Sequence, residues 1–397
     1  MKKQKNVTLL LLLIFSIGAM AQNRSIKFDH GTFQEAKDRA AKEHKLIFMD
    51  CYTSWCGPCK WMAKNMFTND TIADYYNEHF VCAKFDMEVG EGKDLAKKYM
   101  INVYPNLIFA DAEGNMVHRR AGAQQHVQDY IAFAKDAQTP EKTYSAIVKK
   151  FDSGTRDAAF MVNYLDATAE AGLDSKAGAK AYFATQKESD LNSRANWTIM
   201  YKYLSDMNSR EFKYLLANTN TFVQKYTEDS VGQKISMVYE DTLMRIIRDK
   251  KADKKKYLEL KEHIKQSGFK NSEKLLLGTD LSYYQSQGDW TNYTKTAEPL
   301  INKYYQKNVF VINDICWTIY EKVTDKQLLA KAVEWAKISM ELNDPAFMDT
   351  YANLLLKSGN KQEAIKTEEK VVEFLKKNPD PSFPVDEAEA TLATFKK

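Results

Sequence analysis

Two spacings of hydrophobic residues divide the chain. Up to about residue 137, short continuous apolar runs such as 46–49 alternate with amphipathic stretches, which is typical of buried strands placed between helices. Beyond residue 139 the apolar positions recur three and four residues apart, as in Tyr144, Ile147 and Phe151, and this period indicates helices. The pattern therefore predicts an α/β domain followed by an all-helical region.

Turn signals and capping residues place the individual elements of the α/β part. Thr32 and Glu35 have the spacing of a capping box, so a helix should begin there. The segment 112–115 forms a hairpin turn between two strands. We expect strands at 25–28, 46–49, 80–86, 106–110 and 116–119, and helices at 32–43, 60–67, 71–78, 95–100 and 125–137. Elements in this order build a small α/β sandwich.

The first 21 residues have the features of a secretory signal. Three lysines within the first five residues precede an almost wholly apolar run at 7–17, and Ala19-Met20-Ala21 offers a small-x-small cleavage site. The alternative, an uncleaved membrane anchor, needs about 20 apolar residues, which is more than this run provides. We therefore expect cleavage after Ala21, no membrane span in the mature chain, and a periplasmic or secreted protein of a Gram-negative bacterium.

The length of 397 residues is too great for one typical core. Pro140 ends the preceding helix and can occupy the first turn of the next one, so we place a domain boundary just before it. The expected organisation is a signal peptide at 1–21, an α/β domain at 22–138 and an all-helical domain at 139–397.

The last 85 residues contain signs of a helical repeat. Trp317 and Tyr351 lie 34 residues apart, and Pro345 and Gly359 bracket the helical stretch around Tyr351. This arrangement resembles a tetratricopeptide helix pair, although Pro345 and Gly359 are about three residues closer than in the repeat. We expect one such unit near the C-terminus, helical hairpins before it, and a surface for a protein partner.

Charge and ligand spacing exclude two classes of function. The formal net charge is +4, and the signal region supplies three of these charges, so the remainder offers no electrostatic attraction for nucleic acid. The six histidines are scattered, without the spacing of metal ligands or of a nucleophile and its base. We therefore expect no metal and no cofactor.

Cysteine spacing carries the strongest chemical signal in the chain. The five cysteines are Cys51, Cys56, Cys59, Cys82 and Cys316. An odd number, with three of them within nine positions, is unlike a framework of structural bridges. Two cysteines separated by two residues at the start of a helix suit redox chemistry, because the helix N-terminus favours the thiolate of the first and the second lies one turn inside. A structural bridge or half of a zinc site are the alternatives, but no second pair of zinc ligands lies nearby.

Cys56 is therefore the expected nucleophile and Cys59 the resolving thiol. Pro58 should fix the backbone at the start of the helix, and Gly57 should permit a tight approach. Cys51 adjoins Asp50 on the same strand, so its side chain should point to the opposite face of the sheet. The remaining two cysteines should be small core residues.

The stretch from Trp55 to Lys60, Trp-Cys-Gly-Pro-Cys-Lys, is the active-site signature of thioredoxins, and residues 25–137 resemble that family. The resemblance is closest to the periplasmic thioredoxin-like group that includes the C-terminal domain of the transmembrane disulfide-reductant conveyor, through the segment 67–73 and the strand that ends at Asp86. It implies a thioredoxin fold with a central mixed sheet flanked by helices. It also implies a redox-active Cys56–Cys59 disulfide and a role in cell redox homeostasis.

The resemblance assigns roles to residues around the cysteine pair. Asp50 matches the buried aspartate that helps to deprotonate the resolving cysteine, and burial should raise its pKa. Lys84 matches the lysine beside that aspartate. The positions implied to face the substrate are Trp55, Gly57, Pro58, Tyr104, the cis-proline Pro105, and Gly122.

The chain departs from the family pattern at three positions. Lys64 replaces the proline that bends the active-site helix, Asn106 replaces the threonine after the cis-proline, and Cys51 occupies an aromatic core position. These changes leave the redox chemistry intact and the substrate preference open. For Trp55 and Tyr52 the alternative is core packing beside the site, with a supporting role at most.

Together these inferences predict a protein-disulfide reductase of an oxidising, extracytoplasmic compartment. Its partners would be protein disulfides and an upstream thiol electron donor. The Gly-Pro dipeptide resembles that of reducing members of the family, with potentials near roughly −270 mV, rather than that of oxidants near about −120 mV. Two alternatives remain: a redox-sensitive scaffold whose helical domain recruits partners, and a disulfide oxidase or isomerase that uses the same residues.

Overall fold

The computed structural model describes residues 24–249, 254–380 and 382–397. Its internal contacts separate two units, the first ending at Gln186 and the second beginning at Lys187. The expected signal peptide at 1–21 lies outside the described residues. The expected boundary at 138/139 stays a prediction.

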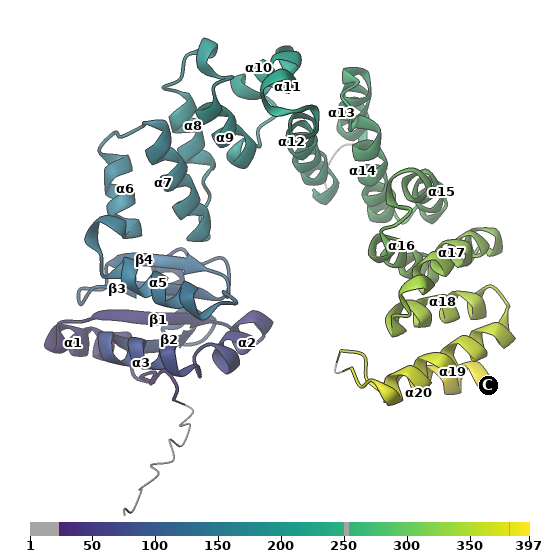
Figure 1. Ribbon diagram of the computed structural model, residues 1–397, viewed down its shortest axis with the longest axis horizontal. Helices are drawn as coiled ribbons and strands as arrows, with labels where there is room; N and C mark the ends of the chain where they lie inside the picture. The colour runs from purple at the N-terminus through teal and green to yellow at the C-terminus, as the bar shows by residue number, and fades with distance from the viewer. Residues whose placement is uncertain (1–23, 250–253, 381) are drawn as a thin grey trace, which may run out of the picture. The chain divides into compact units, whose positions relative to one another are not determined.

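A four-stranded mixed sheet forms the centre of the first unit (Figure 1). The strand order is β2-β1-β3-β4, with β1 parallel to β2 and antiparallel to β3, and β4 antiparallel to β3. The strands are β1 (Leu46–Tyr52), β2 (Phe80–Asp86), β3 (Asn106–Ala110) and β4 (Met116–Ala121). All five residues of β3 are buried, as a continuous apolar run predicts for a central strand.

Helices cover both faces of this sheet. On one face, Phe48 of β1 and Phe109 of β3 pack against α2 (Gly57–Asn65), α3 (Asp70–His79) and α5 (Val127–Ala137). On the other face, Met49 and Ile108 pack against α1 (Phe33–Glu43) and α4 (Gly92–Lys98). Alternate residues of β1 therefore belong to different cores, as the two-residue period of a strand requires. The predicted thioredoxin-type α/β fold is confirmed.

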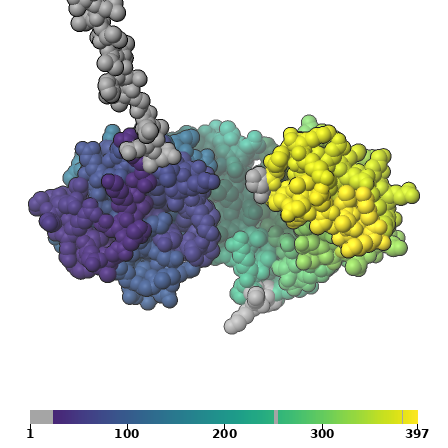
Figure 2. Space-filling view, turned by 90° about the horizontal axis from the view of Figure 1, so that it is seen from below, coloured from purple at the N-terminus to yellow at the C-terminus, as the bar shows by residue number. Residues whose placement is uncertain are grey.

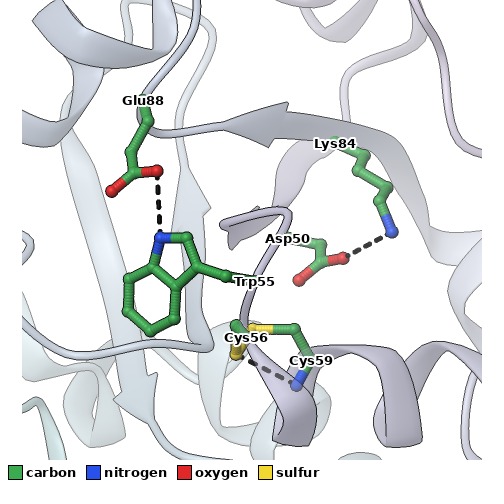
Figure 3. The surroundings of a disulfide bond; sticks show 6 residues. All are labelled: Asp50, Trp55, Cys56, Cys59, Lys84 and Glu88. Atoms are coloured by element: carbon green, nitrogen blue, oxygen red, sulfur yellow. Dashed lines mark hydrogen bonds and ion pairs between the residues drawn. A yellow bond between two sulfur atoms is a disulfide. The ribbon is translucent and has the colours of Figure 1, made fainter.

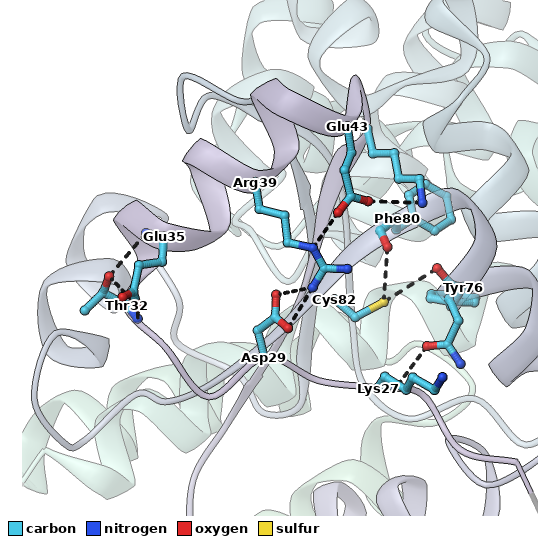
Figure 4. Close-up of polar contacts among 11 residues, drawn as sticks. Lys27, Asp29, Thr32, Glu35, Arg39, Glu43, Tyr76, Phe80 and Cys82 are labelled. Carbon is cyan, nitrogen blue, oxygen red and sulfur yellow. Dashed lines mark hydrogen bonds and ion pairs between the residues drawn. The ribbon is translucent and has the colours of Figure 1, made fainter.

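The expected strand at 25–28 is wrong. The ring of Phe28 packs against Phe48 of β1, but the pairing with the sheet is limited to the next residue, Asp29, which forms a single parallel bridge with Ala83. The backbone N–H of Ile26 donates to the Phe67 carbonyl, and that of Lys27 donates to Asn77 Oδ1 (Figure 4). These partners lie outside the sheet, so the segment cannot form a continuous ladder.

The predicted capping box at the start of α1 is confirmed. The Thr32 hydroxyl accepts the Glu35 N–H at 3.2 Å, and Glu35 Oε2 accepts the Thr32 N–H at 2.7 Å (Figure 4). Two N–H groups that the helix leaves unpaired are thereby satisfied. Further along α1, one guanidinium nitrogen of Arg39 donates to both carboxylate oxygens of Asp29. This contact fixes the helix to the segment that precedes it.

Three helices that follow the α/β domain also belong to the first unit: α6 (Tyr144–Asp152), α7 (Ala158–Glu170) and α8 (Lys176–Phe183). The first two lie beside β4 (Figure 1). The N–H of Tyr144 donates to His118 Nδ1 at 3.0 Å, and Glu170 lies 3.5 Å from Arg120. Figure 2 shows the sheet domain of the first unit as a continuous surface in purple and blue.

The second unit is helical throughout its described residues, as the spacing predicted. After a short 3₁₀ turn at Glu188–Asp190, its helices are α9 (Arg194–Tyr203), α10 (Arg210–Ala217), α11 (Thr219–Tyr226), α12 (Glu228–Arg248), α13 (Lys254–Ser267), α14 (Ser272–Gln287), α15 (Trp290–Leu300), α16 (Val309–Lys322), α17 (Lys326–Ser339), α18 (Pro345–Lys357), α19 (Lys361–Lys377) and α20 (Val385–Lys396). From α10 onward, consecutive helices pack as neighbours, most extensively α18 with α19. None of the helices in the described ranges has the length and apolar character needed to cross a bilayer.

The predicted tetratricopeptide unit falls on α16–α19. Ala352 and Leu355 of α18 pack against Ala364 of α19, so small residues do line this helix pair. Trp317, however, is 38% exposed and contacts Tyr320 of its own helix. The tetratricopeptide assignment therefore stays a prediction.

Candidate active site

Cys56 and Cys59 form a disulfide at the N-terminus of α2, with an S–S distance of 2.06 Å (Figure 3). β1 ends at Tyr52, and a short loop connects it to the first residue of α2, Gly57. Cys56 is the N-cap, and its sulfur accepts the N–H of Cys59 at 3.1 Å. A sulfur in this position receives a hydrogen bond and the positive end of the helix dipole, which both favour a thiolate after reduction.

The two residues between the cysteines differ in what they do for the backbone. Pro58 occupies the first turn of α2, where its missing N–H leaves no hydrogen bond unmade. Gly57 does not have a positive φ, and a Cβ built on it would meet no atom within 4 Å. Packing within the described residues therefore does not require glycine here, and the expected tight approach at Gly57 stays a prediction.

Asp50 and Lys84 form an ion pair behind the disulfide (Figure 3). They are partners in the register of β1 and β2, and Lys84 Nζ lies 3.3 Å from Asp50 Oδ2. The Asp50 side chain is 1% exposed, whereas that of Lys84 is 24% exposed. Burial raises the pKa of Asp50 to about 6, and the Lys84 ammonium limits the rise. The carboxyl is thus close to the pKa that a base needs near neutral pH.

Trp55 extends outward beside the disulfide instead of packing in the core. The residue is 63% exposed, and its indole N–H donates to Glu88 Oε2 at 3.0 Å (Figure 3). Its ring meets that of Tyr104 edge-on, with 6.0 Å between the ring centres. The core-packing interpretation of Trp55 is therefore wrong. Glu88 was missed by the sequence reasoning, because a lone carboxylate after a strand gives no local signal of the residue it contacts.

The loop that carries Tyr104, whose ring meets Trp55, is joined to a second segment expected to face a substrate. The Tyr104-Pro105 peptide is cis, and the Pro105 carbonyl accepts the Gly122 N–H at 2.8 Å. Gly122 has φ +84°, a conformation that favours glycine. The hydrogen bond joins the loop before β3 to the end of β4, so two of the segments expected to face a substrate are held together.

Asn106, one of the three departures from the family pattern, is fully buried at the start of β3. Within the described residues neither its amide nitrogen nor its amide oxygen has a hydrogen-bond partner. Lys64 lies in the last turn of α2, which continues without interruption to Asn65. The helix therefore accepts a lysine where many relatives have a proline.

The other three cysteines are buried and unpaired. Cys51 packs in the core on the α1 and α4 side of the sheet, opposite to the face of Asp50, as the alternation along β1 predicts. The Cys82 thiol donates to the Tyr76 carbonyl (Figure 4), and burial raises its pKa to about 12. Burial also raises the pKa of Cys51 and Cys316 far above the usual range. None of the three is poised as a nucleophile.

A hollow of about 630 Å³ in the first unit lies away from this chemistry. Its lining includes Leu46 and Phe80, the first residues of β1 and β2, whereas the disulfide follows the other end of β1. No cysteine and none of the predicted site residues lines it. Among the described residues no cluster of three or more histidine, cysteine, aspartate or glutamate side chains is placed to hold a metal ion.

Comparison with known proteins identifies the family. The model of the thioredoxin-like domain matches residues 33–138. The chain is 31% identical to Thioredoxin-1 of Drosophila melanogaster over 107 residues. This aligned stretch is 27% of this chain and 89% of that protein. The chain therefore belongs to the thioredoxin-like family through this domain, and its cysteine pair is that of a thiol–disulfide oxidoreductase.

Other similarities are also confined to this part of the chain. Thioredoxin-T of Drosophila melanogaster is 34% identical over 80 residues, 20% of this chain and 47% of that protein. The thioredoxin of Echinococcus granulosus is 36% identical over 74 residues, 19% of this chain and 64% of that protein. The chain thus spans less than two thirds of these two relatives.

Two solved structures that resemble the protein also match less than a third of this chain. A candidate disulphide-isomerase from Bacteroides thetaiotaomicron is 44% identical, with a TM-score of 0.28, over 30% of this chain and 97% of that one. The oxidised C-terminal domain of DsbD from Neisseria meningitidis is 22% identical, with a TM-score of 0.24, over 28% of this chain and 98% of that one. The family assignment rests on the sequence matches.

Proposed function

We propose that this chain is an extracytoplasmic thiol–disulfide oxidoreductase that reduces protein disulfides. The observation that carries the proposal is the position of Cys56, whose sulfur caps α2 and accepts the Cys59 N–H. The buried Asp50–Lys84 pair behind the disulfide supports it, because it places a base near the resolving thiol. The cofactor-free chemistry of a dithiol is sufficient for the reaction.

The proposed reaction begins with the reduced protein. The Cys56 thiolate attacks one sulfur of a substrate disulfide, forms a mixed disulfide and releases the other substrate sulfur as a thiolate. Cys59 then loses its proton to the Asp50 carboxylate, and its thiolate attacks the Cys56 sulfur. The Cys56–Cys59 disulfide forms and the substrate leaves with both of its sulfurs reduced. Two electrons have passed to the substrate, so an upstream thiol donor must reduce the pair before the next cycle.

The roles of the surrounding residues follow from their exposure. Trp55 is an exposed aromatic surface against which a substrate segment can pack, and Tyr104 meets its edge. The loop at Pro105 is held to Gly122 and follows directly after Tyr104, so its backbone is available to the same substrate segment. We assign these residues to substrate binding, together with Gly57 and Pro58 at the start of α2.

The compartment and the direction of electron flow are part of the same proposal. The features of residues 1–21 support export followed by cleavage after Ala21. The Gly-Pro dipeptide supports a reducing potential, near roughly −270 mV. N-terminal sequencing of the protein from the periplasmic fraction of a Gram-negative host should give Gln22 as the first residue. An intact N-terminus in the membrane fraction would instead show an uncleaved anchor.

Insulin reduction and the equilibrium with glutathione test the enzyme itself. The wild-type protein should reduce insulin and have a potential within the reductase range. Cys56→Ser should abolish activity, while Cys316→Ala, a substitution at a buried cysteine of α16, should retain it. A potential near about −120 mV would make the protein an oxidase or isomerase. Activity that survives Cys56→Ser would refute the proposed nucleophile.

We also propose that the helical residues 139–397 help to select the substrate proteins, as helical repeats commonly bind proteins. Cys59→Ser stalls the reaction at the mixed disulfide, so covalently captured proteins can be identified by mass spectrometry. Capture that depends on Cys56 supports an enzyme with a recruiting domain. Partners that bind equally well in a Cys56→Ser/Cys59→Ser protein would instead support the alternative scaffold function.

A further inference from the structure

The Lys84 ammonium lies among aromatic rings as well as beside a carboxylate. Its Nζ is 4.4 Å from the centre of the Tyr52 ring and 5.8 Å from that of Phe28. The same atom is 3.3 Å from Asp50 Oδ2. A cation within about 6 Å of a ring centre is attracted to the negative face of the ring. Tyr52, at the end of β1, therefore contacts the charge that faces Asp50.

A lysine side chain does not stay in such a place without support. Lys84 is partly exposed, and a four-carbon chain that can reach water loses conformational freedom when it is fixed. Asp50, in contrast, is fully buried on β1 and cannot move toward solvent. The strength of their interaction therefore depends on what holds the ammonium over the carboxylate.

We propose that Tyr52 is a positioning residue that holds the Lys84 ammonium on Asp50 and so sets the pH at which Asp50 can act as a base. This inference rests on the proposed function for its role in catalysis, although the effect on Asp50 itself does not. The Tyr52 ring contacts the Lys84 ammonium. It acts through the lysine, and the family signature at the cysteines gives no indication of it.

The sign of the effect follows from the charges. Burial favours protonated Asp50, and the ammonium favours the carboxylate. If the ring is lost, Lys84 moves into water more often, so Asp50 should keep its proton to a higher pH. Fewer molecules can then accept the Cys59 proton at neutral pH, and resolution of the mixed disulfide should become slower.

The other titratable groups around Asp50 do not change their charge in the pH range in which Asp50 is expected to titrate. The Tyr130 phenol of α5 and the Cys51 thiol of β1 both interact with it, and burial raises the pKa of Tyr130 to about 12 and that of Cys51 further. On the α2 side stand Cys56 and Cys59, which carry no proton in the disulfide form. Lys84 is the charged group that β2 presents. In the oxidised protein, Asp50 is therefore the group expected to titrate here between pH 5 and 9.

The test is a pH titration of the Asp50 carboxyl in the oxidised full-length protein. Infrared difference spectra or carbon NMR can follow it, with Asp50→Asn to assign the signal. Tyr52→Phe keeps the ring and should leave the midpoint unchanged. Tyr52→Leu should raise the midpoint by about half a pH unit or more. Tyr52→Met serves as a second ring-free variant if the leucine variant does not fold.

Lys84→Met distinguishes positioning from a general packing effect. It should raise the midpoint at least as far as Tyr52→Leu does, and the double variant Lys84→Met/Tyr52→Leu should match Lys84→Met alone. A further rise in the double variant would overturn the inference, because the ring would then act independently of the lysine. An unchanged midpoint in Tyr52→Leu would overturn it as well.

The same variants separate this inference from the proposed function. In the reduced protein, the pH profile of mixed-disulfide resolution should shift to higher pH in Tyr52→Leu and stay in place in Tyr52→Phe. If the wild-type protein does not reduce insulin, the proposed function fails, and the titration of Asp50 still decides the role of Tyr52. If insulin is reduced but the titration does not move, the function stands and the inference fails.

Discussion

Replacing Asp50 by asparagine should stabilise the sheet at neutral and alkaline pH. Burial raises the pKa of Asp50 from its ordinary 3.8 to about 6. The folded protein therefore binds this proton more tightly than the unfolded chain does, and stability is lost as the pH rises through about 4 to 6. Above pH 7 the loss amounts to about 3 kcal/mol, because each tenfold change in proton affinity is worth about 1.4 kcal/mol. Asparagine keeps the shape of the side chain and avoids the buried charge.

Hydrogen exchange measured by mass spectrometry on the oxidised full-length protein can test this in the first unit alone. After correction for the intrinsic exchange rate, amides of β1 and β3 should exchange about a hundredfold more slowly in Asp50→Asn than in the wild type at pH 8. Near pH 3, where Asp50 is protonated in both the folded and the unfolded chain, the two proteins should differ little. Asp94→Asn, at a side chain that is 83% exposed, is the matched control and should change neither value.

Two results would refute this reasoning. An equal gain in protection from exchange at both pH values would mean that asparagine improves packing and that ionisation of Asp50 does not lower the stability of the fold. No gain at pH 8 would mean that the Lys84 ammonium compensates the buried carboxylate fully. In Asp50→Asn, Lys84 loses its carboxylate partner. This loss should lower the stability of the fold only slightly, since the Lys84 ammonium can reach water.

Three further predictions concern other parts of the molecule. A chain that ends at residue 138 should unfold at a lower temperature than one that ends at residue 186, because contacts of α6 and α7 with β4 are lost. In thermal unfolding, Gly92→Ala should be strongly destabilising, since its Cβ would lie 1.9 Å from a backbone oxygen, whereas Gly57→Ala should cost less than about 0.5 kcal/mol. Burial and the neighbouring Asp349 carboxyl raise the pKa of Glu368 in α19 from its ordinary 4.5 to about 8, so stability of the second unit should fall as the pH rises from about 4.5 to about 8. Glu368→Gln should remove most of that fall in urea denaturation measured at several pH values.

The sheet could be predicted from the sequence to the extent that its strands are continuous apolar runs. β2 and β3 begin and end at the predicted residues. β1 continues three residues beyond its prediction, to Tyr52, because the charged Asp50 interrupts the apolar run but is buried all the same. A buried charge contradicts the local pattern, and such contradictions are expected at functional sites.

The candidate site was predictable where a motif or a family position names the residue, as for Cys56 and Cys59. Contacts between residues far apart in the chain were not. Glu88 meets Trp55 across 33 positions, and Tyr144 meets His118 across 26. Such partners are chosen by the tertiary fold, and neither hydrophobic period nor turn chemistry reports them.

β4 is the last strand of the sheet on its side, and an edge strand offers unpaired backbone groups to any extended chain. Here α6 and α7 lie over that edge. A protein that handles misoxidised, partly unfolded chains would meet many exposed strands, and an open edge would let them add to its own sheet. The helices that follow the domain thus cover the β4 edge, so under the proposed function they would shield that edge from pairing with the extended chains the protein meets.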